Sequence, residues 1–214
     1  MERDPARYRP WVHRHTVTMS HIDPTATIHS TASVDPSATV EAGAMIGCDV
    51  TIGRNAHIGV NAIIQPGVSV GEYATIRDEA LVGPGTKLGP GSTTGRAARI
   101  GPKVEVGTRA VLGDRTHIES GSRISARALV EQRTTLRKGA LVDRDARVGS
   151  RVSVGPRAWI GAGARIGSRT ALGARVVVGS NAEVGNRARL EQGIRVPSNT
   201  VVPPRTRNMA GASS

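Results

Sequence analysis

Two histidines stand in this sequence where their side chains could act as bases. His57 and His117 each lie directly before an aliphatic residue, Ile58 and Ile118 respectively. A neutral imidazole accepts a proton near physiological pH, so either side chain can deprotonate a hydroxyl or an amine. The alternative interpretation is that both are ordinary solvated side chains, and residue type alone leaves the two interpretations open.

Arginine is the second residue type that can do chemistry here, because it recurs at a fixed place in the sequence. It stands three residues after an aliphatic residue at Arg109, Arg115, Arg127, Arg133, Arg151, Arg157, Arg169, Arg175 and Arg187. A guanidinium binds phosphates and carboxylates through paired hydrogen bonds. The recurrence therefore indicates either an anion-binding surface or a solvated basic edge.

Both features belong to a six-residue repeat that runs from Ile22 to Val202. Every sixth residue of this stretch, 31 in all, is Ile, Leu or Val in 30 cases, and the exception is Thr94. The Thr94 hydroxyl is expected to bond to a strand carbonyl, with a local notch in the fold as the alternative. The residue two places before each sixth residue is Ala, Ser, Thr or Val except at Ile194, and Gly often follows the aliphatic residue. Residues two apart in a strand face the same side. Each repeat is thus expected to be a short strand that buries one small and one large side chain, followed by a corner.

The repeat carries a family resemblance. The segments ATVEAGAMIGCDVTIGRNAHIGVNAIIQPGVSVG and AWIGAGARIGSRTALGARVVVGSNAEVG resemble the hexapeptide-repeat, or isoleucine-patch, proteins. This resemblance covers about 180 of the 214 residues. It implies an all-β fold, a single-stranded left-handed parallel β-helix of about ten triangular coils with three repeats per coil. No insertion breaks the register, so the β-helix is expected to be uninterrupted by loops, and the resemblance further implies a homotrimer.

The expected boundaries leave a short segment on each side of the β-helix. Residues 1–20 form a basic arm containing Trp11, which is expected either to cover the first coil or to contact a partner. Residues 21–203 form the β-helix, and residues 204–214 form a tail that is expected to be disordered. The chain shows no signal-peptide pattern and no apolar run of membrane-spanning length, which favours a cytoplasmic protein.

The resemblance leaves three classes of function open. The first is an acyl- or acetyltransferase with His57 or His117 as the base. A coenzyme A thioester or a carrier-bound acyl group would be its co-substrate, and no cofactor would be bound permanently. The second is a non-catalytic scaffold or anion-binding module, which is favoured because acyltransferases of the family usually interrupt the repeat with a loop. The third is a gamma-class carbonic anhydrase, which needs three histidines on one metal ion. His21 and His57 would lie two coils apart, about 10 Å, so no metal site is predicted.

A coil of three repeats, implied by the resemblance, places Arg115, Arg133, Arg151, Arg169 and Arg187 on one corner, with Arg205 as the next position. We call these six residues the arginine ladder. Their spacing would be about 4.8 Å, close enough for like charges to repel. The ladder is predicted to bind an anion, with a solvated corner as the alternative. No aromatic residues are interleaved with it, which weakens a role in binding single-stranded nucleic acid.

Net charge points to the same part of the chain. The formal charge of the protein is +12, and residues 21–108 hold six basic and eight acidic residues whereas residues 109–190 hold sixteen and six. An anionic ligand or partner is therefore expected toward the C-terminal coils, with binding that weakens as salt rises. Replacing Arg133, Arg151 and Arg169 by Gln should flatten that salt dependence.

Trp159 precedes Ile160, so it is expected to point outward and to lie at a subunit contact.

Overall fold

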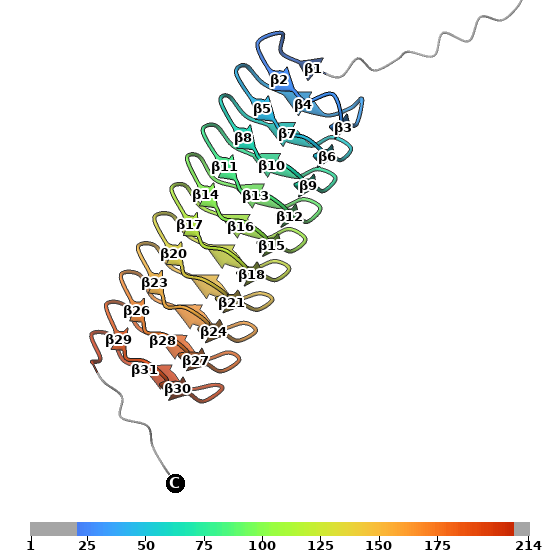
Figure 1. Ribbon diagram of the computed structural model, residues 1–214. Helices are drawn as coiled ribbons and strands as arrows, with labels where there is room; N and C mark the ends of the chain where they lie inside the picture. Colours follow the sequence, from blue (N-terminus) through green and yellow to red (C-terminus); the bar gives the residue numbers. More distant parts are fainter. Residues whose placement is uncertain (1–20, 208–214) are drawn as a thin grey trace, which may run out of the picture.

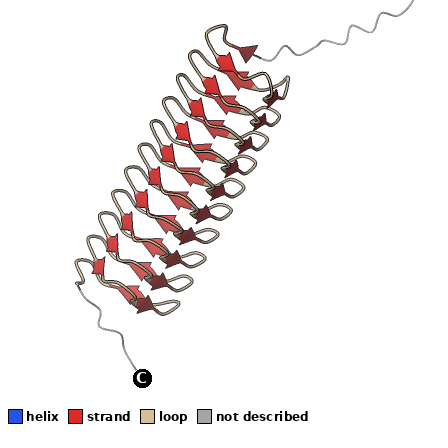
Figure 2. Cartoon of the chain, viewed as in Figure 1, coloured by secondary structure: helices blue, strands red, loops and turns tan. Residues whose placement is uncertain are grey.

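The strands of this protein are pairs of residues that recur every six residues. Figures 1 and 2 show these short strands stacked along one elongated prism. The computed structural model describes residues 21–207, in which there are 31 strands of two residues each and no helix. Within this part of the chain each strand begins six residues after the one before it, so the predicted absence of interrupting loops is confirmed.

The strands are sorted into three parallel sheets that run the length of the molecule. Sheet A contains β1 (His21–Ile22), β4 (Thr39–Val40), β7 (His57–Ile58), β10 (Thr75–Ile76), β13 (Thr93–Thr94), β16 (Val111–Leu112), β19 (Leu129–Val130), β22 (Arg147–Val148), β25 (Arg165–Ile166), β28 (Glu183–Val184) and β31 (Val201–Val202). Sheet B contains β2 (Thr27–Ile28), β5 (Met45–Ile46), β8 (Ile63–Ile64), β11 (Leu81–Val82), β14 (Arg99–Ile100), β17 (His117–Ile118), β20 (Thr135–Leu136), β23 (Ser153–Val154), β26 (Ala171–Leu172) and β29 (Arg189–Leu190). Sheet C contains β3 (Ser33–Val34), β6 (Thr51–Ile52), β9 (Ser69–Val70), β12 (Lys87–Leu88), β15 (Glu105–Val106), β18 (Arg123–Ile124), β21 (Leu141–Val142), β24 (Trp159–Ile160), β27 (Val177–Val178) and β30 (Arg195–Val196).

Each strand from β1 to β28 pairs with the strand three places later in the chain, so one coil takes three repeats. His57 of β7, for example, pairs with Thr39 of β4 and Thr75 of β10. The result is a parallel β-helix of about ten triangular coils (Figure 1). The predicted fold class is confirmed, and the architecture agrees with the left-handed β-helix that the family resemblance implied.

The interior is filled by the two columns of the repeat. The aliphatic residues are buried in every coil from Val40 to Val202, except that Thr94 replaces one of them, and the small residues two places earlier are buried beside most of them. Ile22 is 37% exposed, so the first coil is less covered than the rest among the described residues. Burying an aliphatic side chain of this size contributes about 1.5–3 kcal/mol, and the column repeats that gain in every strand.

The corners share one backbone conformation. From Gly43 to Arg205, every sixth residue has a φ between 51° and 76°, in the left-handed region. That region suits Gly, Asn and Asp and is disfavoured for other residues. The three corners of each coil therefore impose the same backbone requirement on very different side chains.

Thr94 corrects one expectation from the sequence, namely that its buried hydroxyl would be bonded to a strand carbonyl. Its side chain is 1% exposed and its Oγ1 has no hydrogen-bond partner among residues 21–207, as is also true of Ser92 Oγ and Thr116 Oγ1. By contrast, Thr134 Oγ1 donates to the carbonyl of Gly149 at 2.8 Å. Thr134 lies in the small column and reaches the carbonyl of Gly149 there, but Ser92 and Thr116 lie in the same column without a partner, so the column alone does not decide whether a hydroxyl is bonded.

The last coil extends slightly beyond the expected boundary at residue 203. Arg205 N donates to the carbonyl of Asn186 at 2.9 Å, and Arg207 forms an isolated bridge with Arg189. The predicted basic arm, residues 1–20, and the end of the predicted tail, residues 208–214, lie outside the described residues.

Candidate functional site

His57 lies on the outer surface of sheet A, as its place before Ile58 predicted. Its side chain is 40% exposed, and its Nε2 lies 3.2 Å from Oε1 of Glu41, which is itself 35% exposed. The pair is open enough for a substrate to reach the ring. Its two side chains also lie within ion-pair distance, so the carboxylate stands beside the imidazole.

Glu41 reaches His57 from the preceding coil. It follows β4, directly after the buried Val40, at a place where the repeat often has Gly. It therefore stands two places after Thr39, the residue that pairs with His57. Trp159 and Asp143 repeat this relation: Trp159 pairs with Leu141, and its Nε1 donates to Oδ2 of Asp143, two places further on, at 2.9 Å.

The residues stacked directly on His57 are Thr39 and Thr75, so stacking in a coil of three repeats does not reveal Glu41. The sequence pattern that identifies this contact is a carboxylate two residues after a residue that pairs with the histidine, just beyond the end of that residue's strand. Side chains lean along the strand, so the residue that follows the paired strand can touch an outward side chain in the next coil.

His117 has a different environment. It lies on β17 in sheet B, between Arg99 and Thr135, and its side chain is exposed. Within residues 21–207 its ring has no hydrogen bond or ion pair, and the residue two places after its partner Arg99 is Gly101. Since His57 lies on sheet A and His117 on sheet B, one chain does not bring the two predicted bases together.

The other described histidines do not join either site. His29 Nδ1 lies 3.0 Å from Thr31 Oγ1 within its own turn, and His21 is exposed on β1, two coils before His57. Among the described residues there is no group of three or more His, Cys, Asp or Glu side chains placed to hold a metal ion.

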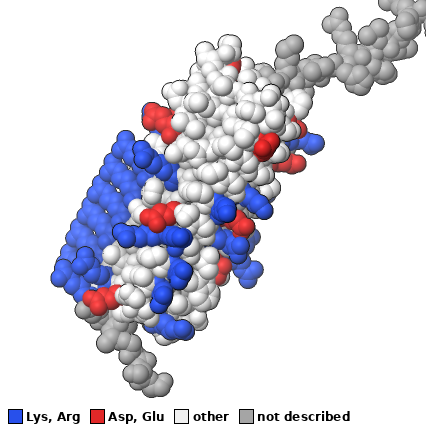
Figure 3. Space-filling view, viewed as in Figure 1, with Lys and Arg blue, Asp and Glu red and all other residues white. Residues whose placement is uncertain are grey.

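The arginine ladder follows the corner between sheets A and B, which we call the A–B corner. Each ladder residue comes three residues after the aliphatic residue of a sheet A strand, and all but Arg205 come two residues before a sheet B strand. All six side chains are exposed. Figure 3 shows basic side chains gathered along one edge of the C-terminal half of the prism.

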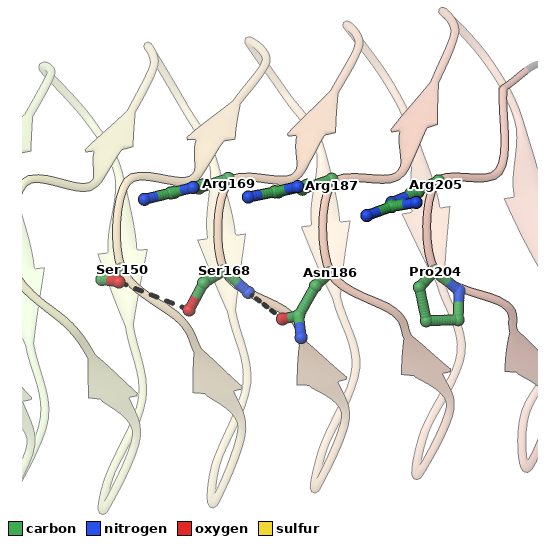
Figure 4. A pocket seen from close by; sticks show the side chains of 7 residues that line it. All are labelled: Ser150, Ser168, Arg169, Asn186, Arg187, Pro204 and Arg205. Atoms are coloured by element: carbon green, nitrogen blue, oxygen red, sulfur yellow. Dashed lines mark hydrogen bonds between the residues drawn. The ribbon is translucent and has the colours of Figure 1, made fainter.

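The C-terminal part of the ladder forms one wall of a groove. Arg169, Arg187 and Arg205 line it, together with Ser150, Ser168, Asn186 and Pro204, and its volume is about 690 Å³. In Figure 4 the three arginine side chains lie side by side in a row, each pointing toward the preceding coil. On the opposite wall Ser150 Oγ donates to Ser168 Oγ at 3.3 Å, and Ser168 N donates to Asn186 Oδ1 at 2.7 Å (Figure 4).

Ion pairs in the described chain involve other arginines. Arg77 pairs with Asp114, Arg96 with Glu79, Arg123 with Glu105 and Arg127 with Asp145, at distances between 2.7 and 3.8 Å. No carboxylate of residues 21–207 forms an ion pair with a ladder arginine. The hydrogen bond from Arg127 lowers the pKa of Asp145 below its usual value, and the same contact raises the pKa of Arg127.

The same corner changes character in the N-terminal coils. After the first coil its positions there are Gly43, Asn61, Glu79 and Ala97, all with positive φ. A smaller groove of about 270 Å³ lies where the two parts meet, and its lining includes the acids Glu79 and Asp114. The uninterrupted row of unpaired cationic side chains therefore begins, among the described residues, at Arg115.

Comparison with known proteins identifies the kind of repeat. Residues 49–84, which include His57, match the family described as bacterial transferase hexapeptide (six repeats). The resemblance to hexapeptide-repeat proteins is thereby confirmed for this segment, and the same six-residue period continues on both sides of it. None of the curated protein sequences compared with this chain matches it.

Solved structures with a similar fold include three acyl- or acetyltransferases. LpxA from Acinetobacter baumannii is 19% identical, with a TM-score of 0.49, and the match covers 83% of this chain and 68% of that one. UDP-N-acetylglucosamine acyltransferase from Arabidopsis is 18% identical, with a TM-score of 0.43 and coverages of 83% and 66%. A mutant of perosamine N-acetyltransferase from Caulobacter crescentus, in complex with CoA and GDP-perosamine, is 24% identical, with a TM-score of 0.36 and coverages of 56% and 50%.

At these identities and TM-scores the likenesses assign no activity to this chain. The part of the chain that the structure describes has no helix long and apolar enough to cross a membrane.

Proposed function

We propose that this protein is a hexapeptide-repeat acyltransferase in which His57 is the general base. The observation that carries the proposal is the 3.2 Å contact between His57 Nε2 and Glu41 Oε1. The match of residues 49–84 to the bacterial transferase hexapeptide family supports it, because His57 lies inside that segment. The acyl donor would be a coenzyme A thioester or a carrier-bound acyl group, used as a co-substrate.

The chemistry follows from which ring nitrogen is free. If Nε2–H donates to Glu41, Nδ1 carries the lone pair and accepts the proton of an acceptor hydroxyl or amine. The acceptor oxygen or nitrogen then attacks the thioester carbonyl, the carbon–sulfur bond breaks, and the imidazolium returns its proton to the departing thiolate. Glu41 remains next to the ring while the ring carries that proton.

A homotrimer is part of the proposal, because the family resemblance implies one and an apolar row on sheet C is available for it. Leu141 is 40% exposed and Trp159 is 39% exposed, and Val177 lies next to Trp159 in the same row. Exposed aromatic residues are enriched at interfaces, so we expect this row to be covered in the assembly. Light scattering of the full chain should give three copies, and Trp159 fluorescence should report a site shielded from water. The cytoplasmic location predicted from the sequence belongs to the same proposal.

Donor binding and turnover test the acyltransferase directly. Acetyl-coenzyme A at 100 times its dissociation constant should stabilise the folded chain by about 2.7 kcal/mol, which raises the melting temperature by about 5–10 °C. Release of free thiol, measured with a panel of hydroxyl and amine acceptors, should fall about 100-fold or more in His57→Ala. Glu41→Gln should retain the fold and lose most of the rate.

His117→Ala is the matched control, because His117 is also an outward histidine on a strand but has no carboxylate partner among the described residues. It should turn over at the rate of the parent protein. If His57→Ala and His117→Ala are equally active, or if the donor neither binds nor reacts, the acyltransferase proposal fails.

The second candidate is a non-catalytic scaffold. It is favoured by the uninterrupted repeat from β1 to β31, because a prism without a protruding loop has no segment to close over a substrate. A trimer that shows neither donor binding nor thiol release would support this alternative.

A further inference from the structure

We propose that the arginine ladder is a binding edge for a linear chain of phosphate groups, such as inorganic polyphosphate, that lies along the axis of the prism. The edge is separate from His57, because ladder residues begin at Arg115, more than three coils later in the chain. The inference therefore does not depend on whether the protein transfers acyl groups.

The backbone fixes the spacing of the ladder. The amide of each ladder residue donates to a carbonyl of the preceding coil: Arg133 N to Asp114 O at 2.9 Å, Arg151 N to Gln132 O at 3.1 Å, and Arg169 N to Ser150 O at 2.9 Å. Arg187 N and Arg205 N donate to Ser168 O and Asn186 O at 3.0 and 2.9 Å. At about 4.8 Å per coil, six guanidinium groups line about 24 Å of a straight edge. Such a preformed row loses little freedom when a chain of anions binds.

Arginine at this corner lowers the stability of the fold, through its backbone conformation and through charge repulsion. All six ladder arginines have φ between 56° and 62°, in the left-handed region where Arg is disfavoured. The fold accepts better residues there, since Gly43 and Asn61 occupy the same corner in earlier coils. Six like charges in one row also repel each other. Four arginines at the other corners accept the same φ, but among the described residues only the A–B corner combines it with a like charge in six successive coils. That combination indicates that the row has a role other than folding.

The ladder arginines differ from Arg127, which lies at the corner between sheets C and A, because Arg127 has a carboxylate partner. At that corner, Arg127 is bonded to Asp145 through Nε and Nη2, both at 2.8 Å, and the next corner residue is Gly163. The ladder instead has no such partner within the described residues, and the residues before its last five members are Gln132, Ser150, Ser168, Asn186 and Pro204. Its guanidinium groups are thus free to bind an external anion.

The lining of the groove selects among anions. Apart from the arginines it consists of Ser150, Ser168, Asn186 and Pro204, so hydroxyl and amide groups stand beside the cations. This lining has no aromatic ring for stacking bases. It also has no apolar floor for the apolar side of a protein segment. A guanidinium pairs two N–H groups with two phosphate oxygens, so a bare chain of phosphates satisfies the row along its whole length.

The test compares two triple variants of the full chain that remove the same charge. R133N/R151N/R169N interrupts the ladder, and R157N/R175N/R195N removes three arginines from the same half of the prism but away from the A–B corner. Asn is chosen because it occupies corner positions with positive φ at Asn181 and Asn199, so the corner substitutions suit the backbone. Circular dichroism melts should show that both variants are folded, with the ladder variant at least as stable as the parent.

Calorimetric titration with inorganic polyphosphate gives the readout. We expect the ladder variant to bind at least about tenfold more weakly, and its slope of log K against log salt to be smaller by about 2, since three phosphate contacts are lost. The control variant should stay within about threefold of the parent, because salt screens charges that do not contact the chain. Affinity should rise from tripolyphosphate to a chain that spans the ladder and then level off for longer chains.

A charge-preserving variant tests whether binding needs the paired N–H groups of the guanidinium or only its charge. R133K/R151K/R169K should keep the salt slope of the parent while binding several-fold more weakly, because Lys cannot pair with two phosphate oxygens in the same way. Equal losses in the two Asn variants would overturn the proposal, since the charge would then act only as a diffuse field. Tighter binding of single-stranded DNA with the same number of phosphates, or binding of anionic vesicles but not of polyphosphate, would also overturn it.

Discussion

The N-terminal and C-terminal coils of this protein share one backbone and differ in what they display at the corners. From Gly43 to Lys103 the positive-φ positions hold Gly or Asn at six places, and the others hold Asp, Tyr, Glu, Ala and Lys. From Arg109 to Arg205, ten of the seventeen such positions hold Arg. Because the φ values are alike in the two halves, the backbone does not demand arginine.

The comparison separates the requirements of folding from those of binding. Both halves keep the aliphatic column inward, and both keep the register of three repeats per coil. Within the described residues, only the C-terminal half places unpaired cations in an uninterrupted row at one corner. The difference lies in side chains that contribute nothing to the core, which is where selection for a ligand acts without disturbing the fold.

The largest effect is expected from changes that break the shared backbone. A Cβ at Gly155 would meet the backbone of Gly173, and one at Gly53 would lie 2.9 Å from the amide nitrogen of Glu72. Gly155→Val and Gly53→Val should each lower the free energy of unfolding by about 3 kcal/mol, because the stacked coils are forced apart. The melting temperature measures this.

Ser125→Val is the matched control, since Ser125 occupies the same place in its repeat and already carries a side chain. It should melt within a few degrees of the parent protein. A large loss in only one of the two glycine variants would show that the halves do not share one packing.

The next largest effect is expected from polar residues buried inside the β-helix. Thr94 brings an unpaired hydroxyl into the core, so Thr94→Val should raise the free energy of unfolding by about 1 kcal/mol. Thr134→Val is the opposite case, because Thr134 Oγ1 donates to Gly149 O and accepts from Val152 N at 3.2 Å. It should lower stability by about 1 kcal/mol. Thermal melts of the two variants should show a higher melting temperature for Thr94→Val and a lower one for Thr134→Val. A lower melting temperature for Thr94→Val would mean that the Thr94 hydroxyl is bonded after all.

Extending the ladder sharpens the comparison. E79R/A97R continues the row into the N-terminal half, so polyphosphate binding should tighten several-fold and its salt slope should steepen by about 1.4 for two added contacts. N55R/Y73R/G91R adds the same charge at the corner between sheets C and A. Titration calorimetry should find little change in that control, and equal gains in the two variants would remove the distinction between the corners.

The smallest effect is expected from the ion pair between Arg127 and Asp145 at the corner between sheets C and A. The hydrogen bond from Arg127 lowers the pKa of Asp145 in the folded protein. A carboxyl whose folded pKa lies below its unfolded value adds stability above the unfolded pKa, and that stability is lost as pH falls through the folded pKa. In Asp145→Asn the melting temperature should therefore fall less steeply than in the parent below about pH 4.

Asp49→Asn is the control, because Asp49 also has positive φ, at 56°, and forms no ion pair within the described residues. Its acid melting profile should follow that of the parent. Identical profiles for all three proteins would mean that the Arg127–Asp145 pair adds nothing to stability.

The sequence predicted the repeat, the strands and the stacking of individual residues. His117 pairs with Arg99 and Thr135, and His57 with Thr39 and Thr75, as a coil of three repeats requires. This succeeded because a β-helix without insertions converts spacing along the chain into position in space. The alignment of the arginine ladder follows from the same arithmetic.

Contacts that depend on how a side chain leans were decided only by the tertiary structure. Glu41 contacts His57 although it lies beyond the end of the strand that pairs with β7. Asp114 Oδ1 lies 3.8 Å from Arg77 Nη1 although the two residues belong to different coils. The missing partner of the Thr94 hydroxyl is another such case, because it depends on whether a carbonyl lies within reach of one atom. Periodicity determines where each Cα lies, but direction, reach and hydrogen-bond geometry belong to individual side chains, and these decide which residues form a site.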